Sequence, residues 1–164
     1  MKATVATADA PKTPRLDGAA GKHLTFALAG EEYGLPVLKV REIIRIIDIT
    51  PVPQVPPHIR GVINLRGKVI SVIDLRLTFG FPPRDDDDRT CIVVVDAAAD
   101  NGTVMIGVVV DSVADVLNIS ADDVEATPDF GGRVRVDGIK AVAKVQGKVT
   151  MLVDIDRALG VDAL

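Results

Sequence analysis

Short apolar segments, rich in valine, isoleucine and leucine, recur along the chain between glycines, prolines and charged residues. Segments of this length, bounded by turn formers, are typical of β-strands. We predict strands over 22–30 and 31–38 with a turn at Gly30-Glu31, a hairpin over 61–76 that turns at Gly67, a strand pair over 90–96 and 103–110, and a last hairpin around Gly147.

Other segments interrupt the strand pattern. Val40, Ile43, Ile44 and Ile47 stand at helical spacing and favour a short helical turn, and we predict a turn over 111–117 as well. The proline-rich stretch that follows, 46–61, fits an edge strand and a connection, because proline cannot donate to a central β-ladder.

Two short helices are predicted after the two hairpins, over 74–80 and 154–160. Each would begin at an aspartate N-cap, Asp74 or Asp154, and each has a glycine just past its end.

The chain contains a duplication. Residues 61–80 fall on 141–160 with a shift of 80 positions, and the Gly-Lys-Val triplet beginning at Gly67 recurs there. Upstream, 34–44 falls on 107–117 with a shift of 73, which aligns Gly34 with Gly107, Val40 with Val113 and Glu42 with Asp115. Two ordered blocks with compatible spacing indicate two copies of one β unit.

Four or five short strands per copy, closed by a helical turn, predict small β-barrels, which leave no exposed sheet edges. We expect an all-β fold with barrels over approximately 22–84 and 89–160, between which strands could be exchanged. The acidic stretch 82–89 reads as a solvated linker, with a weak alternative as a cation site, and 1–21 as a disordered N-terminal tail.

Composition removes several classes of function. The 164-residue chain has a net charge of −4 and only 3% aromatic residues, so it lacks the basic stripe and stacking platforms of nucleic-acid binders. The single cysteine, Cys91, forms no internal disulfide, and no apolar run is long enough to span a bilayer. These features predict a cytoplasmic protein.

Catalytic and metal sites have little support in the pattern. Asp74, Asp111 and Asp154 each follow an apolar run, which leaves a small metal-dependent hydrolase as an alternative function. Asp74 and Asp154 already have capping roles, however, and the two histidines, His23 and His58, belong to no metal-ligand cluster. We predict a binding protein without catalytic residues, metal or cofactor.

The duplication singles out Arg66 at the tip of the first hairpin. Its counterpart in the second copy is Gln146, so the fold does not require an arginine there. Arginine is favoured at interface hot spots, and Arg66 is therefore either a partner contact or an ordinary exposed arginine.

Several blocks resemble the CheW family of chemotaxis coupling proteins over residues 22 to 160. They are FALAGEEYGLPVLKVREII, ITPVPQVPPHIRGVINLRGKVISVIDLRLTFG, IGVVVDSVADVL and VTMLVDIDRALG. The resemblance implies two five-stranded SH3-like barrels around a shared hydrophobic groove. It also implies a non-catalytic adaptor that couples the cytoplasmic tips of chemoreceptors to the histidine kinase CheA, whose regulatory domain pairs with it barrel against barrel. An adaptor of this fold for another pathway, such as surface motility, stays an alternative.

The resemblance also implies sites. Receptor binding would involve Val40, Glu42, Ile43 and Arg66, with Val110, Ser112 and Val113 on the second barrel's side of the groove. Kinase binding would involve Gly61, Val62, Asn64 and Leu65. The chain departs from the family at Ser71, where a proline is frequent, and this departure concerns packing. No receiver or kinase domain accompanies the module, which favours the stand-alone coupling form.

Overall fold

A computed structural model describes residues 20–126 and 138–159, so the tail expected over 1–21 falls, except for its last two residues, outside the described part. Most of the described part consists of β-strands. They are β1 (Gly21–Leu28), β2 (Glu31–Pro36), β3 (Val40–Arg45), β4 (Ile59–Leu65), β5 (Lys68–Asp74), β6 (Cys91–Ala99), β7 (Gly102–Val110), β8 (Ser112–Ile119), β9 (Val124–Glu125), β10 (Ile139–Val145) and β11 (Lys148–Val153). The helices are short: η2 (Val37–Lys39), α2 (Leu75–Thr78), η3 (Ala121–Asp123) and α3 (Ile155–Leu159). Of the helices described, none has the length and apolar character needed to cross a membrane.

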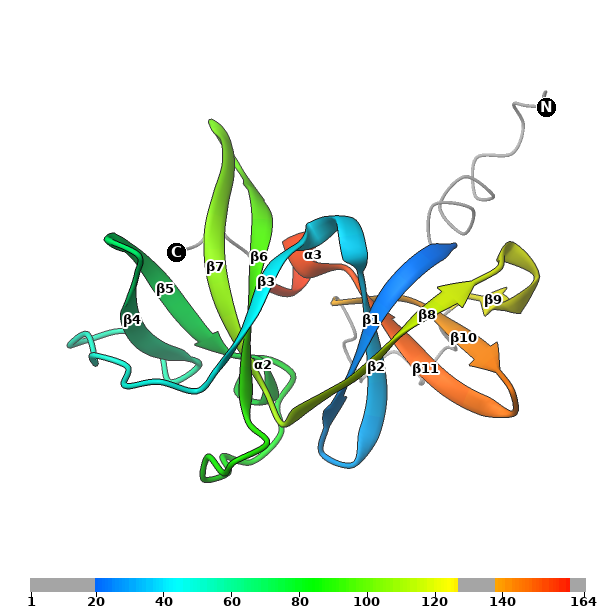
Figure 1. Ribbon diagram of the computed structural model, residues 1–164, viewed down its shortest axis with the longest axis horizontal. Helices are drawn as coiled ribbons and strands as arrows, with labels where there is room; N and C mark the ends of the chain where they lie inside the picture. Colours follow the sequence, from blue (N-terminus) through cyan, green and yellow to red (C-terminus); the bar gives the residue numbers. More distant parts are fainter. Residues whose placement is uncertain (1–19, 127–137, 160–164) are drawn as a thin grey trace.

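The strands form two curved sheets, which make the two lobes of Figure 1. The six-stranded sheet has the order β8-β1-β2-β11-β10-β9, and the five-stranded sheet has the order β3-β6-β7-β5-β4. Each contains one parallel pair, β2 with β11 and β5 with β7. The remaining neighbours are antiparallel.

The two halves of the sequence exchange their first hairpins. β1 and β2 lie in the sheet of β8 to β11, whereas β6 and β7 lie between β3 and β5. The barrels therefore do not coincide with the contiguous stretches 22–84 and 89–160, and the strand exchange left open by the sequence is present. A sequence repeat identifies equivalent segments, but it does not say whether a hairpin pairs with strands of its own copy or of the other copy. The same face of the hairpin is buried in either case.

The duplication is visible in the structure. β4 and β10 have the same order of buried and exposed residues, and Gly34 of β2 and Gly107 of β7 take matching places beside β11 and β5. A Cβ on Gly107 would lie 2.8 Å from Ile92 Cγ2 and one on Gly34 would lie 3.2 Å from Leu152 Cδ2. Both glycines thus allow neighbouring residues to pack closely against the strand.

The turns predicted over 40–47 and 111–117 are wrong, because most of each segment is a strand, β3 or β8. The pairing of β3 with β6 shifts register between Val40 and Glu42, and the pairing of β1 with β8 shifts at the matching place. The burial pattern of β8 is irregular, as expected at a bulge, whereas β3 keeps its two-residue alternation but places Glu42 on the half-buried side and Ile43 on the exposed side, which gives an apolar spacing that resembles a helix.

The two predicted helix caps are confirmed. The Asp74 side chain accepts a hydrogen bond from Arg76 N at 3.0 Å, and Asp154 accepts one from Arg157 N at 3.2 Å. The helix after Asp74 ends at Thr78, and Gly80 follows with φ +85. Gly160 lies outside the described residues.

Three apolar clusters hold the fold together. The central cluster joins both sheets, with Phe26 and Tyr33 from one and Val93 and Val108 from the other. Each barrel also has a smaller apolar cluster of its own. The cluster of the six-stranded barrel surrounds Leu152, and that of the five-stranded barrel is formed by residues of β4, β5, β6 and β7. The lobes are therefore packed against each other through a continuous core rather than joined by a flexible linker.

Candidate functional site

Arg66 lies at the tip of a two-residue hairpin between β4 and β5. Its φ is +53 and that of Gly67 is +86, the left-handed pair of a type I′ turn. Asn64 supports the turn, because its Oδ1 accepts a hydrogen bond from Gly67 N at 2.8 Å. Gln146 has φ +54 in the equivalent turn between β10 and β11, so the turn itself does not require arginine.

Arg66 forms a two-pronged ion pair with Glu42 of β3. Its Nη2 donates to Glu42 Oε1 at 2.7 Å, and its Nη1 donates to Oε2. β3 and β4 are the opposite edges of the five-stranded sheet, so this pair links the two edges and helps to close the barrel. Hydrogen bonds from Arg66 lower the pKa of the Glu42 carboxyl, and the pKa of Arg66 is raised in turn.

The Arg66 side chain nevertheless remains 72% exposed, compared with 26% for Glu42. Ile43, next to Glu42 on β3, is also exposed, at 42%. The structure therefore pairs two of the predicted receptor-binding residues, Glu42 and Arg66, at this end of the barrel, whereas the alternating burial of β3 places Ile43 on the opposite face of the strand. We name Glu42 and Arg66, together with the neighbouring Ile43, the β3–turn surface.

The other predicted receptor-binding residues lie elsewhere. Val40 and Val113, which are repeat counterparts, are partly buried against the central core, and Ser112 lies at the crossing from β7 to β8. Val110 is 1% exposed inside that core. Its assignment as a groove contact is corrected on this ground, because its side chain offers a partner no surface.

Gly61 and Val62, two of the predicted kinase-binding residues, line a pocket of about 480 Å³ on the five-stranded barrel. The pocket lies between the β4–β5 hairpin and the proline-rich connection, from which Val52, Val55 and Pro56 contribute apolar wall. Val62 and Thr50 exchange two backbone hydrogen bonds of 2.9 Å, which hold the connection against β4. We name this the β4 pocket.

Asn64 and Leu65 have different surroundings. Asn64 is exposed and supports the turn, whereas Leu65 is partly buried against the cluster inside the five-stranded barrel. The sequence alone did not indicate that residues of the proline-rich connection form part of the pocket wall. It also missed Val69, which is 67% exposed, although the alternating pattern of β5 places this side chain on the outer face.

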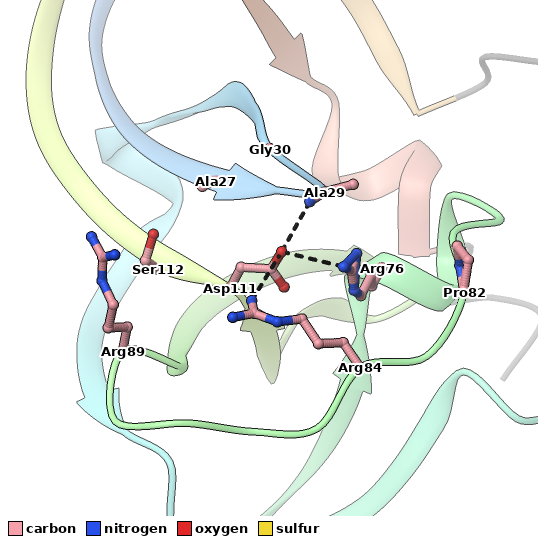
Figure 2. Close-up of a pocket in the computed structure, with 9 residues that line it drawn as sticks. All are labelled: Ala27, Ala29, Gly30, Arg76, Pro82, Arg84, Arg89, Asp111 and Ser112. Carbon is pink, nitrogen blue, oxygen red and sulfur yellow. Dashed lines mark hydrogen bonds and ion pairs between the residues drawn. The ribbon is translucent and has the colours of Figure 1, made fainter.

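The three aspartates considered for a hydrolase each have separate partners. Asp74 is 6% exposed at the start of α2, where burial raises the pKa of its carboxyl, and Asp154 caps α3. Asp111 lies in a cavity beside arginines, shown in Figure 2, and accepts a hydrogen bond from Ala29 N at 2.9 Å. Across residues 20–126 and 138–159, no three His, Cys, Asp or Glu side chains are grouped to hold a metal ion.

The acidic run 85–88 is exposed but partly tethered. Asp86 receives a two-pronged ion pair from Arg60, with distances of 3.0 and 2.8 Å, and Asp87 pairs with Arg84 at 2.6 Å. This connection is therefore held to the five-stranded barrel through Arg60 of β4 and braced internally by the pair of Arg84 with Asp87, rather than extended by its own repulsion.

Comparison with known proteins gives one consistent result. The family model described as the CheW-like domain matches residues 22–162. The chemotaxis protein CheW of Klebsiella aerogenes is 34% identical over 136 residues, which cover 83% of this chain and 80% of that protein, and that of Bacillus subtilis is 32% identical over 84% and 86%. The crystal structure of the scaffolding protein TtCheW from Thermoanaerobacter tengcongensis aligns with a TM-score of 0.74 and 32% identity, over 82% of this chain and 89% of that one. This likeness confirms the predicted fold class of two SH3-like barrels.

Proposed function

The chain belongs to the CheW-like domain family, and from this premise we propose that it is a non-catalytic chemotaxis adaptor. It couples the cytoplasmic tips of chemoreceptors to the regulatory domain of the histidine kinase CheA and helps to assemble both into signalling arrays. The observation that carries the proposal is the family match over residues 22–162, which includes both barrels. The protein acts in the cytoplasm at membrane-associated arrays and needs no cofactor.

The β3–turn surface is the proposed receptor contact. A receptor tip is a helical hairpin, and a helix docks through apolar side chains flanked by charged ones. The guanidinium of Arg66, mostly exposed, is fixed in direction by Glu42, and Ile43 supplies an exposed apolar side chain on the other face of the same strand. A fixed arginine loses little side-chain entropy when a partner binds, which favours affinity. Val40, Ser112 and Val113 extend this proposal toward the junction of the barrels.

The β4 pocket is the proposed kinase contact. Its walls are mainly apolar, and Gly61 has no side chain to obstruct it. An apolar side chain from the kinase regulatory domain would fill such a pocket, as buried anchors do at the centre of protein interfaces. Asn64 and Leu65 lie farther along the same strand and support the hairpin that forms one wall.

A co-sedimentation experiment with receptor-containing membranes and the kinase tests both contacts. Wild-type protein should bring the kinase to the membranes. Arg66→Glu should abolish sedimentation with receptors while the protein still binds the isolated kinase regulatory domain. Val62→Asp should have the opposite effect, because a carboxylate in the β4 pocket costs binding energy without a partner.

The duplication provides matched controls. Gln146→Glu places the same charge on the equivalent type I′ turn, and Val142→Asp alters the equivalent position of β10. Both controls should bind receptor and kinase like wild type. Failure of the wild type to bind either partner would reject the adaptor function, whereas normal binding by Arg66→Glu and Val62→Asp would reject only the site assignments.

A further inference from the structure

Lys140 lies in a bulge of β10, and Arg60 takes the same place in β4. The register of β10 with β11 shifts across Lys140, and that of β4 with β5 shifts across Arg60. The shift of 80 positions that relates the two hairpins also relates these two residues. The two side chains are therefore equivalent in the duplication, and neither partner surface proposed above includes Lys140.

The two equivalent cations differ in their partners. Arg60 donates to both carboxylate oxygens of Asp86, at 3.0 and 2.8 Å, and lies 3.9 Å from Asp74. Lys140 is partly buried, and its amine has no ion pair and no hydrogen bond with any residue in the described part of the chain. Asp154, the repeat counterpart of Asp74, acts on the charge of Lys140 only from beyond ion-pair distance. The amine thus lacks the direct partner that its equivalent has.

The carboxylates near Lys140 are already engaged by other groups. Asp156 Oδ2 accepts a hydrogen bond from Lys39 Nζ at 3.0 Å, and its Oδ1 accepts one from Ala98 N at 2.7 Å. Asp154 caps the N-terminus of α3. Because Lys39 is held at Asp156, Lys140 faces a second ammonium group as well as the carboxylates.

These surroundings favour the neutral form of the Lys140 amine. Burial lowers the pKa of Lys140, and the charge of Lys39 adds to this effect, while Asp154 and Asp156 act in the opposite direction. His23 of β1 also senses Lys140, whose charge contributes to the lowered pKa of the imidazole. The neutral amine carries a free electron pair, so it is the nucleophilic form of lysine. Partial burial leaves this amine open to small reagents.

We propose that Lys140 is a site of acylation by small acyl phosphates. The electron pair of the amine attacks the acyl carbon, the bond from this carbon to the phosphate oxygen breaks, and inorganic phosphate leaves with that bonding pair. The nitrogen gives up one proton to water, so that a neutral amide replaces the amine. Amide formation removes the positive charge that faces Lys39, and the surroundings that activate the amine therefore also favour the product. The proposal does not depend on the adaptor function.

The test is acetylation of the whole chain by acetyl phosphate at pH 8, with the extent at each lysine followed over time by peptide mass spectrometry. Lys144 and Lys148, exposed on the same hairpin, are references within each molecule. Lys140 should react about three times faster or more, since a pKa lowered by one gives about ten times more neutral amine and lower basicity cancels part of this gain. In the urea-denatured chain the three lysines should react at similar rates. A rate at Lys140 equal to or below that of Lys144 would overturn the proposal.

A substitution of Lys39 distinguishes the effect of charge from that of accessibility. Lys39→Gln should slow acetylation of Lys140 about threefold or more, because it removes the neighbouring charge and frees Asp156 for Lys140, while Lys148 should react as before. Lys68→Gln, at an exposed lysine of β5, is the control and should leave the rate at Lys140 unchanged. An unchanged rate at Lys140 in Lys39→Gln would also overturn the proposal, and it would leave the adaptor function untouched.

Discussion

At the scale of single residues, Gly61 combines a backbone role with a place in the β4 pocket. Its φ is +142, and a Cβ added there would lie 2.0 Å from the carbonyl oxygen of Thr50. The close approach exists because Thr50 pairs with Val62 and holds the proline-rich connection against β4. The glycine therefore allows the pocket wall to form.

Gly61→Ala should consequently destabilise the protein by more than about 2 kcal/mol, because it adds a backbone clash to a left-handed conformation. Urea denaturation of the variant would measure this. Gly67→Ala is the matched control: its φ is +86, but no atom lies within 4 Å of the added Cβ. Its cost should stay near 1 kcal/mol, the usual cost of the conformation alone, and equal losses in both variants would contradict the clash.

His23 makes stability depend on pH. It is 1% exposed, its Nδ1 contacts Gly21 O at 3.0 Å, and its Nε2 has no hydrogen-bond partner among the described residues. Burial lowers the pKa of the imidazole below its ordinary 6.5, and Lys140 adds to the effect. The unfolded chain then binds a proton at a higher pH than the folded chain, so acid favours unfolding.

We therefore expect the free energy of unfolding to decrease as the pH falls from about 7.5 through the ordinary histidine pKa of about 6.5 toward 5.5. His23→Gln should remove this part of the pH dependence, measured by urea denaturation at several pH values. His58→Gln controls for the loss of a histidine and should keep the wild-type slope. An unchanged slope in His23→Gln would mean that another group causes the dependence.

Arg66 illustrates how far sequence reasoning reaches at this scale. Its difference from Gln146 marked it as dispensable for the fold, and the shared type I′ turn agrees with this. The ion pair with Glu42 could not be predicted, since the two residues are 24 positions apart on opposite edges of one sheet. Only the closure of the barrel brings them together.

At the scale of elements, one ion pair, here called a latch, ties each of the short helices α2 and α3 to neighbouring strands. The charges are arranged in opposite order in the two latches. After β7, Asp111 pairs with Arg76 of α2 and accepts a hydrogen bond from Ala29 N at 2.9 Å. After β2, Lys39 pairs with Asp156 of α3 at 3.0 Å. Asp156, the repeat counterpart of Arg76, also accepts a hydrogen bond from Ala98 N at 2.7 Å. Lys39 lies one position after Leu38, the repeat counterpart of Asp111, so the two copies have similar ion pairs of reversed charge that are not fully equivalent in position.

Substitutions of Asp156 can distinguish the contribution of its ion pair with Lys39 from that of its hydrogen bond with Ala98 N. Asp156→Ala should lower stability by about 1 kcal/mol, because Lys39 and Ala98 N both lose their partner. Asp156→Asn should lose less, since the remaining amide oxygen still accepts from Ala98 N. Thermal denaturation measures both, with Asp100→Ala at the exposed β6–β7 turn as control. Equal losses for Ala and Asn would assign the whole effect to the ion pair.

Most elements were predictable because alternation and turn residues act locally. Both hairpins of the duplication and both aspartate-capped helices were predicted for this reason. The strands β3 and β8 were not, because in β8 a bulge disturbs the alternation and in β3 the half-buried position is held by Glu42 and an exposed one by Ile43. A bulge depends on the partner strand, which the local pattern does not specify.

At the scale of the whole molecule, the exchanged hairpins make each barrel depend on both halves of the chain. β1 and β2 complete the sheet that contains β8 to β11, and β6 and β7 form the middle of the other sheet. The central core also draws residues from both sheets. The protein should therefore unfold in one cooperative transition, despite its two lobes.

Cleavage at a protease site inserted into the exposed acidic run 85–88 tests this interdependence. The two fragments should remain associated in size-exclusion chromatography under native conditions, because each sheet contains strands from both. The isolated N-terminal fragment holds β3, β4 and β5 without β6 and β7, which separate them in the intact sheet. It should lack a folded circular dichroism spectrum alone and recover one when mixed with the C-terminal fragment. A stable, monomeric N-terminal fragment would show instead that contiguous barrels form, and that the exchange is not needed for the fold.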